Sequence, residues 1–295
     1  MARRASGFSR FFRTLILLAA VLAALVLGYA YTSGAWYFLF PSSAHDTHQP
    51  YLAPGLRSPA VLVFSKTNHF RHIDGIASGV QALEQIAIGK GWTTFFTENG
   101  AVFNTQQLAS FEAVVFLNAT GDMLSHEQQA VFEAWLENGG GWLGIHGAGD
   151  GSHQDWPWYM KNLIGADFTA HTMGPQIQIA SIVTENHQHP AVQAIPNVWN
   201  HADEWYSWEV SPRAAGFTIL AALDEDSYTP VQSFPWGDRN LRMNDHPVVW
   251  SNCVASGRAV YTALGHTAES FKQPVMRKIL ENSLSWLMSD SADGC

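Results

Sequence analysis

Short apolar runs that look like buried strands alternate with helix-like patterns over most of this chain. The first such run covers residues 60–64, and apolar residues then recur at helical spacing over 73–87. Further strand-like runs occupy 92–97, 112–118 and 141–146. Ser125 is a suitable N-cap for a helix that Asn138 and Gly139 would close. This alternation predicts an α/β fold whose mostly parallel sheet is flanked by helices.

The pattern is less regular after residue 150, but it continues. Residues 156–165 have the composition of a short helix, and residues 274–288 are typical of a final helix with one apolar face. Strand-like runs occupy 176–184, 217–223, 247–255 and 258–264. Because only Ser256 and Gly257 separate the last two runs, these are expected to form a hairpin.

A basic segment and then an apolar segment precede the α/β region. Four arginines within residues 1–13 come before an uninterrupted apolar run at 15–31, which is just long enough for a membrane-spanning helix. We therefore expect a cytoplasmic basic tail at 1–13 and a transmembrane signal anchor at 14–32. The positive-inside rule then places the rest of the chain in the periplasm or outside the inner (cytoplasmic) membrane. The alternative is a signal peptide that is cleaved at the small residues 33–35, which would give a secreted protein.

The remaining domain boundaries follow from composition. Residues 33–59 are rich in Pro and Ser, show no periodicity and are expected to be a linker. The α/β domain is then expected at 60–288, and residues 289–295 form a C-terminal tail.

Charge and aromatic content restrict the class of ligand. The formal net charge is −9, and no Lys/Arg-rich patch occurs after the N-terminus. Nucleic acid is therefore not an expected partner, because phosphate binding needs concentrated positive charge. The 12 Trp and 8 Tyr residues favour a small carbohydrate instead. The expected partners are a carbohydrate and the membrane, and the sequence leaves open whether the chain forms a homo-oligomer.

Polar side chains follow several predicted strands at the point where each strand ends. In an open parallel sheet these carboxyl ends lie along one edge, where ligands bind. The side chains are Asn68, His69, Arg71 and His72 after the first strand, Asp122 after the third, His146 and Asp150 after the fourth, and His266 after the last. Histidines that converge from separate strand ends predict a functional pocket at this edge.

Two later segments are expected to cover the same edge. His171 follows a loop-like break, and a later polar stretch contains Asp203, Glu204, Trp205 and Tyr206. Adjacent carboxylates on a strand point in different directions, so one of the pair should face the pocket while the other braces it. The neighbouring rings suit a wall that packs against a sugar. The alternative is that this stretch forms a solvated acidic turn.

Six ordered segments of this chain resemble the signature blocks of one family. They read "NHFRH", "ENGGGWLGIHGAGD", "GADFTAH", "ENHQHPAV", "DEWYSW" and "RAVYTALGHTAESF". In this order they resemble the ThuA-like (trehalose utilisation) family over about residues 60–288. The resemblance implies a class I glutamine amidotransferase-like, flavodoxin-type α/β fold. It also implies a link to sugar catabolism, through 3-keto-glycoside intermediates.

The same comparison bears on the glycine-rich corner after the fourth strand. "WLGIHGAG" resembles the amidotransferase segment that presents a nucleophilic cysteine, with His146 in the place of that cysteine. Neither Cys253 nor Cys295 lies at the corner, so thiol-based glutamine hydrolysis is excluded. An imidazole there is expected to act as a general base or a metal ligand.

Two functions fit these residues. The first is a hydrolase, lyase or isomerase that acts on an oxidised glycoside, with histidine and oxygen ligands for zinc, nickel or manganese. The expected catalytic residues are His146, Asp203, Glu204 and Arg71. The expected metal ligands are His72, His146, His171 and His266, and the expected substrate contacts are Asn68, His69, Asp122, Asp150, Trp205 and Tyr206. The second function is a membrane-tethered module that binds sugar without turnover.

Overall fold

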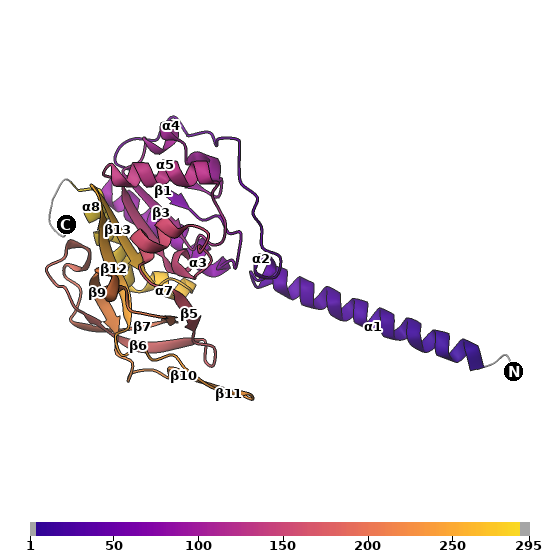
Figure 1. The fold of residues 1–295 in the computed structure, drawn as a ribbon. Coiled ribbons are helices and arrows are strands. Elements are labelled where there is room, and N and C mark those ends of the chain that lie inside the picture. Colours follow the sequence, from indigo (N-terminus) through magenta and orange to yellow (C-terminus); the bar gives the residue numbers. More distant parts are fainter. Residues whose placement is uncertain (1–3, 290–295) are drawn as a thin grey trace.

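The computed structural model of the chain describes residues 4–289. Residues 1–3 of the predicted basic tail and residues 290–295 of the predicted C-terminal tail lie outside the described residues. Helix α1 (Arg4–Thr32) extends away from the folded domain (Figure 1). Its segment Arg10–Thr32 is apolar and long enough to cross a membrane, as an anchor or as a signal sequence. One short turn, α2 (Trp36–Leu39), follows.

A nine-stranded mixed sheet forms the centre of the domain (Figure 1). In spatial order its strands are β2 (Thr93–Thr97), β1 (Ala60–Phe64), β3 (Ala113–Leu117), β4 (Gly141–Ile145), β13 (Gly257–Thr262), β12 (Pro247–Val254), β9 (Thr218–Leu223), β6 (Ile177–Thr184) and β7 (Val198–Glu204). The first five are mutually parallel, and the direction then alternates from β13 to β7. Strands β9 and β7 therefore share the direction of the parallel five. This confirms the predicted α/β fold and adds an antiparallel extension to it.

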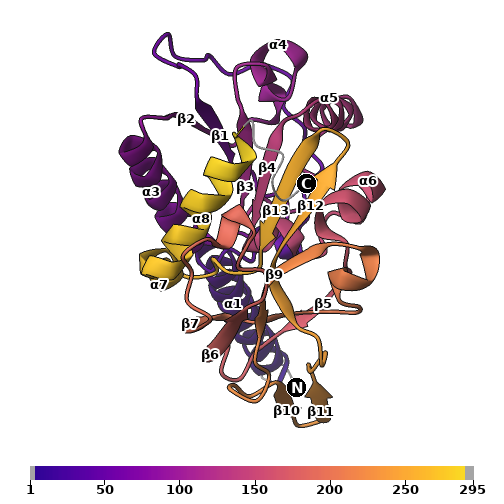
Figure 2. The ribbon, with the colours of Figure 1, turned by 90° about the vertical axis from the view of Figure 1, so that its left-hand side faces the viewer.

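Helices cover both faces of this sheet. Figure 2 shows α3, α7 and α8 on one face and α5 and α6 on the other. The helices of the domain are α3 (Ile73–Lys90), α4 (Thr105–Leu108), α5 (His126–Glu137), α6 (Pro157–Tyr159), α7 (Ala268–Lys272) and α8 (Pro274–Leu287). Short helical turns are η1 (Gly100–Val102), η2 (His146–Gly149), the π-helical η3 (Met160–Ile164), η4 (Pro190–Val192) and η5 (Pro212–Ala215). The helix predicted at 156–165 is thus α6 continued by η3.

Local sequence signals explain where these elements begin and end. Strands β1, β3 and β4 are buried along their whole length, which matches their continuous apolar sequence. Ser125 caps α5 in a reciprocal capping box. The predicted hairpin joins β12 to β13 and pairs Val254 with Gly257, so its turn residues are Ala255 and Ser256, one position earlier than predicted.

Two small two-stranded sheets complete the domain. Strand β5 (Phe168–His171) pairs with β8 (Tyr206–Trp208) and sets His171 opposite Tyr206. Strand β10 (Val231–Phe234) pairs with β11 (Gly237–Asn240) in a hairpin that projects from the domain (Figure 1). The β5–β8 pair brings residues from distant parts of the chain to the carboxyl edge of the main sheet.

The segment between α2 and β1 contains no helix or strand, but it is bonded to the domain surface. The backbone N–H of Ser42 donates to the Asn68 carbonyl oxygen (3.1 Å), and Lys66 Nζ lies 2.6 Å from Asp46 Oδ2. The side chain of Gln128 donates to the Asp46 carbonyl oxygen (2.7 Å). These contacts hold α2 close to the edge that carries the polar residues.

Candidate metal centre

His146 lies at the corner where β4 passes into η2. Its backbone φ is +46°, in the left-handed region that residues other than glycine seldom adopt. The strand, the sharp turn and the strained residue reproduce the geometry of a nucleophile elbow, with an imidazole at its apex. Asn118, also at positive φ after β3, accepts a hydrogen bond from Gly147 N at 2.9 Å and donates to the Gly265 carbonyl oxygen at 3.1 Å. Asn118 therefore ties together the ends of three parallel strands.

The hydrogen bonds of His146 fix which of its nitrogens can bind a ligand. Nδ1 lies 2.7 Å from the Ala263 carbonyl oxygen, so the proton of the neutral ring is on Nδ1. Nε2 then presents its lone pair to the pocket. Tyr206 packs over the same ring, with centroids 4.2 Å apart. The ring is fully buried and held in one orientation.

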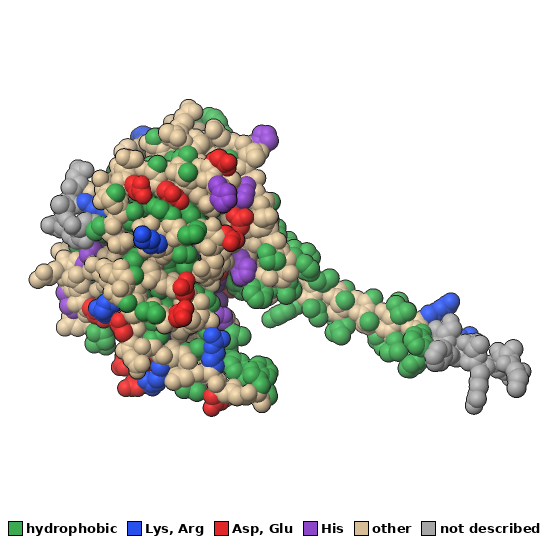
Figure 3. Space-filling view, in the orientation of Figure 1, with side chains coloured by type: hydrophobic (Ala, Val, Ile, Leu, Met, Phe, Trp, Pro, Cys, Tyr) green, Lys and Arg blue, Asp and Glu red, His purple; other side chains and the backbone are tan. Residues whose placement is uncertain are grey.

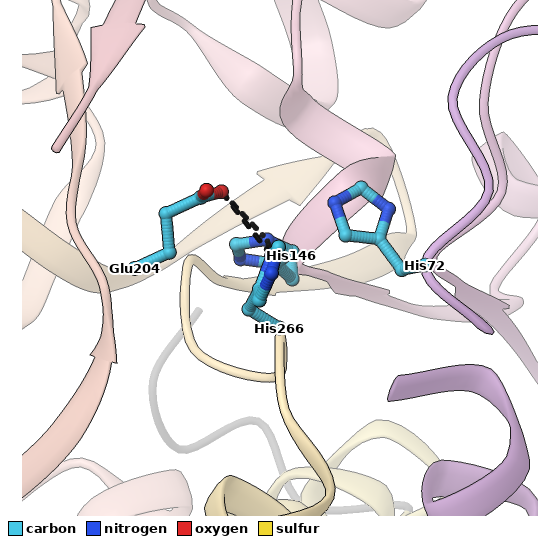
Figure 4. Close-up of side chains that lie close together, drawn as sticks. All are labelled: His72, His146, Glu204 and His266. Carbon is cyan, nitrogen blue, oxygen red and sulfur yellow. Dashed lines mark hydrogen bonds and ion pairs between the residues drawn. The ribbon is translucent and has the colours of Figure 1, made fainter. Parts of the chain in front are cut away.

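Three further side chains converge on His146. His72 comes from the loop before α3, Glu204 is the last residue of β7, and His266 follows β13. One ligand atom from each of the four residues lies within 4.8 Å of the others. Figure 4 shows Glu204 and His72 on opposite sides of the pair formed by His146 and His266. The parallel strands supply three members and the antiparallel extension supplies the fourth.

The spacing and chemistry of this group fit a divalent cation. His146 Nε2 lies 3.1 Å from His266 Nδ1 and 3.5 Å from Glu204 Oε2, and His266 Nδ1 lies 3.2 Å from Glu204 Oε2. Donor atoms around a tetrahedral zinc ion with bonds of about 2.0–2.1 Å are ~3.3 Å apart. His72 Nδ1 is buried without a hydrogen-bond partner. Three imidazoles and one carboxylate are a donor set that zinc, nickel and manganese accept.

Electrostatics keep these groups in the forms that bind a cation. Burial, and then the neighbouring imidazoles, lower the pKa of His72 well below its usual value, so its ring is neutral. Burial alone would raise the pKa of Glu204, but hydrogen bonds from His146, His171 and His266 outweigh burial and hold it below its ordinary range. Glu204 is therefore an anion, although only 2% of its side chain is exposed.

The two adjacent carboxylates divide their tasks as the alternation of side chains on a strand requires. Glu204 reaches the imidazoles, whereas Asp203 is fully buried and accepts from backbone N–H groups. Its Oδ2 accepts from Gly265 N at 2.7 Å and its Oδ1 from His266 N at 3.1 Å. Asp203 thus positions the loop that carries His266.

The four residues border a pocket of about 350 Å³. Glu204, His72 and His266 are part of its lining, and His171, His69, Asp150 and Tyr206 line it as well. His171 Nδ1 lies 3.0 Å from Glu204 Oε1, the carboxylate oxygen that does not face His146, so His171 stands outside the group of four. Gln176 Nε2 donates to that same oxygen at 2.5 Å.

Asp150 is the second carboxyl group of this pocket. Burial raises the pKa of Asp150 to about 7, against hydrogen bonds from Ser152 that lower it. His69 Nδ1 lies 3.9 Å from Asp150 Oδ2. A carboxyl group with this pKa can accept and return a proton near neutral pH.

Four residues of the predicted site lie elsewhere. Arg71 bonds to Thr67 and Glu98 and lines a separate cavity. Asn68 donates to the Asp122 and Ala44 carbonyl oxygens, and the Asp122 carboxylate is 2.8 Å from His45 Nε2. Trp205 is buried against the rings of His201 and Tyr228 rather than in the pocket lining.

The structure also shows site residues that were absent from the prediction. Asn118 and Gln176 orient members of the cluster, and Ala35, Phe38, Phe70, Phe168 and Met173 line the pocket. Asn118 could have been found, since a polar residue directly after a buried strand has the same signal as His146. The apolar residues carry no signal that separates them from core or linker residues.

Comparison with known families decides the relationship of the chain. The profile of the ThuA family, described as trehalose utilisation, matches residues 60–287. The chain belongs to the ThuA family. No curated protein matches it.

Solved structures share the fold of this ThuA-family chain. A ThuA-like protein from Bacteroides uniformis has a TM-score of 0.68 at 24% identity, over 84% of this chain and 98% of that one. A ThuA-like protein from Parabacteroides merdae has a TM-score of 0.60 at 18% identity, over 79% and 91%. A cytoplasmic protein from Salmonella typhimurium has a TM-score of 0.52 at 11% identity, over 78% and 100%. At these identities the likeness shows the fold alone.

Register places the one described cysteine of this ThuA-family chain away from the elbow. Cys253 on β12 pairs with Arg258, which in turn pairs with Gly141 at the start of β4. His146 follows the other end of β4. The corner that would present a nucleophilic cysteine therefore carries only the imidazole.

Proposed function

We propose that this chain is a metal-dependent enzyme that acts on a carbohydrate, with His72, His146, Glu204 and His266 as the metal ligands. The observation that carries the proposal is the convergence of three imidazoles and one ionised carboxylate on a single point of a pocket. The family relationship supports a sugar as the substrate. A divalent ion at this point would polarise a carbonyl group or a bound water.

The residues around the cluster suit elimination from a glycoside that carries a ketone at C3. The ketone acidifies the proton at C2, and the Asp150 carboxylate takes that proton. The C1–O bond then breaks, a C1=C2 double bond conjugated with the ketone remains, and protonated Asp150 returns its proton to the leaving alcohol oxygen. Asp150 suits both transfers because its pKa is about 7. His69, close to Asp150, and the ring of Tyr206 would hold the sugar.

The N-terminal helix supports a location at the inner membrane. Helix α1 is apolar over Arg10–Thr32, and this stretch is not buried by the domain. Arg10 and Arg13 lie at the end of α1 far from the domain. An uncleaved anchor would therefore hold the domain on the periplasmic or outer side of the membrane.

The test uses the full chain in phosphatidylcholine nanodiscs. We expect about one equivalent of zinc, nickel or manganese by mass spectrometry and cleavage of methyl 3-keto-β-glucoside. His146→Ala should lose both the metal and the turnover. His126→Ala, which changes an exposed histidine on α5, is the matched control and should keep both.

Two results would decide against this proposal. Turnover that persists without metal and in His146→Ala would remove the cluster from the chemistry. Sugar binding without turnover, with or without each metal, would identify a binding module in which Tyr206 and the cluster only hold the ligand.

A further inference from the structure

The segment directly after α1 is fixed against the loop that carries His69 and His72. Arg71 N donates to the Gly34 carbonyl oxygen at 2.9 Å. Gly34 has a φ of +83°, and a Cβ there would lie 2.0 Å from the Arg71 carbonyl oxygen. Phe38 sets its ring edge-on to His69, with centroids 5.1 Å apart. The end of α1 is therefore joined to the domain at the pocket and is not a free tether.

This segment forms part of the pocket wall. Ala35 and Phe38 line the pocket together with residues of the metal centre. Phe38 and Met173 are each 56% exposed, whereas His72 and Glu204 are 5% and 2% exposed. The pocket thus has a buried polar floor and a mouth edged by exposed apolar side chains. A ligand that fills it would carry a polar head and an apolar tail.

The mouth of the pocket lies beside the part of the chain that can enter a membrane. The apolar segment of α1 ends at Thr32, three residues before Ala35, a separation of at most about 10 Å. Figure 3 shows apolar side chains along α1 up to the domain surface. When α1 spans a bilayer, this mouth is therefore at the boundary between lipid and water.

A second element supports the same orientation. The β10–β11 hairpin points in the same general direction as α1 (Figure 1), and both lie toward the lower part of the domain in Figure 2. At its turn Trp236 is 83% exposed and stacks on Phe234, with centroids 5.3 Å apart. Tryptophan is enriched at the boundary between lipid and water. An exposed tryptophan on this side is expected if this side faces the membrane.

We infer that the substrate is an amphiphilic glycoside taken from the membrane surface, with its sugar at the metal centre and its apolar aglycone between Phe38 and Met173. The inference rests on the proposed function for the sugar, but not on any chemical step. Ala35 and Phe38 would make the anchor junction a determinant of aglycone specificity.

The experiment compares two probes with the same sugar, methyl and octyl 3-keto-β-glucoside. Binding is measured by calorimetry on the full chain in phosphatidylcholine nanodiscs, in an Asp150→Asn background that blocks turnover, with empty nanodiscs as the blank. We expect the octyl probe to bind at least tenfold more tightly, because several methylene groups leave water. Phe38→Ala and Met173→Ala should each reduce the octyl-to-methyl affinity ratio about fivefold or more.

Leu39→Ala is the matched control, since Leu39 lies on the same turn, is 49% exposed and is not part of the pocket lining. It should keep the wild-type ratio. An octyl-to-methyl ratio near one, or equal ratios in Phe38→Ala and Leu39→Ala, would overturn the inference while methyl-probe turnover left the proposed function intact. Failure of both probes to bind would overturn the inference and the substrate assignment together. An octyl preference without turnover in the wild type would support the inference and count against the enzyme.

Discussion

Replacement of Asp150 by Asn should make the protein more stable, by an amount that depends on pH. Burial raises the pKa of Asp150 from its ordinary 3.8 to about 7, and only 9% of its side chain is exposed. Asn keeps an oxygen that can accept from Ser152 N, as Asp150 Oδ1 does at 3.0 Å. The substitution therefore removes the titration while it keeps this hydrogen bond.

The sign follows from where the proton is. Between pH 3.8 and about 7 the carboxyl group is ionised in the unfolded chain but protonated in the folded one. Unfolding then releases a proton, so the stability of the wild type falls as the pH rises, by about 1.4 kcal/mol per pH unit. Over this window the loss sums to about 4 kcal/mol and stays constant above pH 7. The advantage of Asp150→Asn should grow over the same window.

Differential scanning calorimetry of the chelator-treated full chain in nanodiscs measures this advantage. For a domain of this size 1 kcal/mol shifts the melting temperature by about 2–4 °C, so the variant should melt about 8–16 °C above the wild type near pH 7.5 and about level with it near pH 4. Asp245→Asn is the control of opposite sign, because its hydrogen bond with Arg213 lowers the pKa of Asp245. That variant should be the less stable one at neutral pH. A gap for Asp150→Asn that is absent, or that does not change with pH, would refute the reasoning.

Three further outcomes are expected. The rate of glycoside cleavage should rise with pH through about 7, because Asp150 must lose its proton to act as a base; a rate that is flat from pH 5 to 8 would contradict this role. Asp203→Asn should weaken metal binding about 10–100-fold in a zinc titration monitored by calorimetry, since an amide cannot accept from both N–H groups that hold the His266 loop; unchanged affinity would mean that the loop needs no such support. Gly257→Ala should cost at least 2 kcal/mol in thermal unfolding, because its Cβ would lie 1.9 Å from the Leu136 carbonyl oxygen, and a melting temperature within 2 °C of the wild type would disprove the clash.

The buried part of the sheet could be predicted because its sequence has only one interpretation. The run at 60–64 is β1 residue for residue, and the runs at 112–118 and 141–146 contain β3 and β4. Strands β5 and β8 are only three or four residues long, and the β10–β11 hairpin is largely exposed, so neither pair leaves a periodic signal. Prediction therefore succeeded where burial on both faces forced a continuous apolar run.

The same reasoning found the histidines of the cluster but not all of their partners. His72, His146 and His266 follow parallel strands, and the common carboxyl edge was enough to bring them together. The choice between Asp203 and Glu204 depends on the register of β7 in the antiparallel extension, which the sequence does not specify. The contribution of Phe38 could not be foreseen, because residues 33–59 show no periodicity and dock through isolated bonds.

The strained corner at His146 links the fold to the proposed chemistry. A residue at φ +46° costs about 1–3 kcal/mol and persists only where its surroundings hold it. Here the Ala263 carbonyl oxygen holds the ring, and Asn118 holds the turn through Gly147 N. The corner that would present a cysteine thus presents the lone pair of Nε2, at 3.1 Å from a second imidazole. Two such lone pairs repel each other unless a proton or a cation lies between them, so the geometry of this corner is stable as a cation site and unfavourable as an empty one.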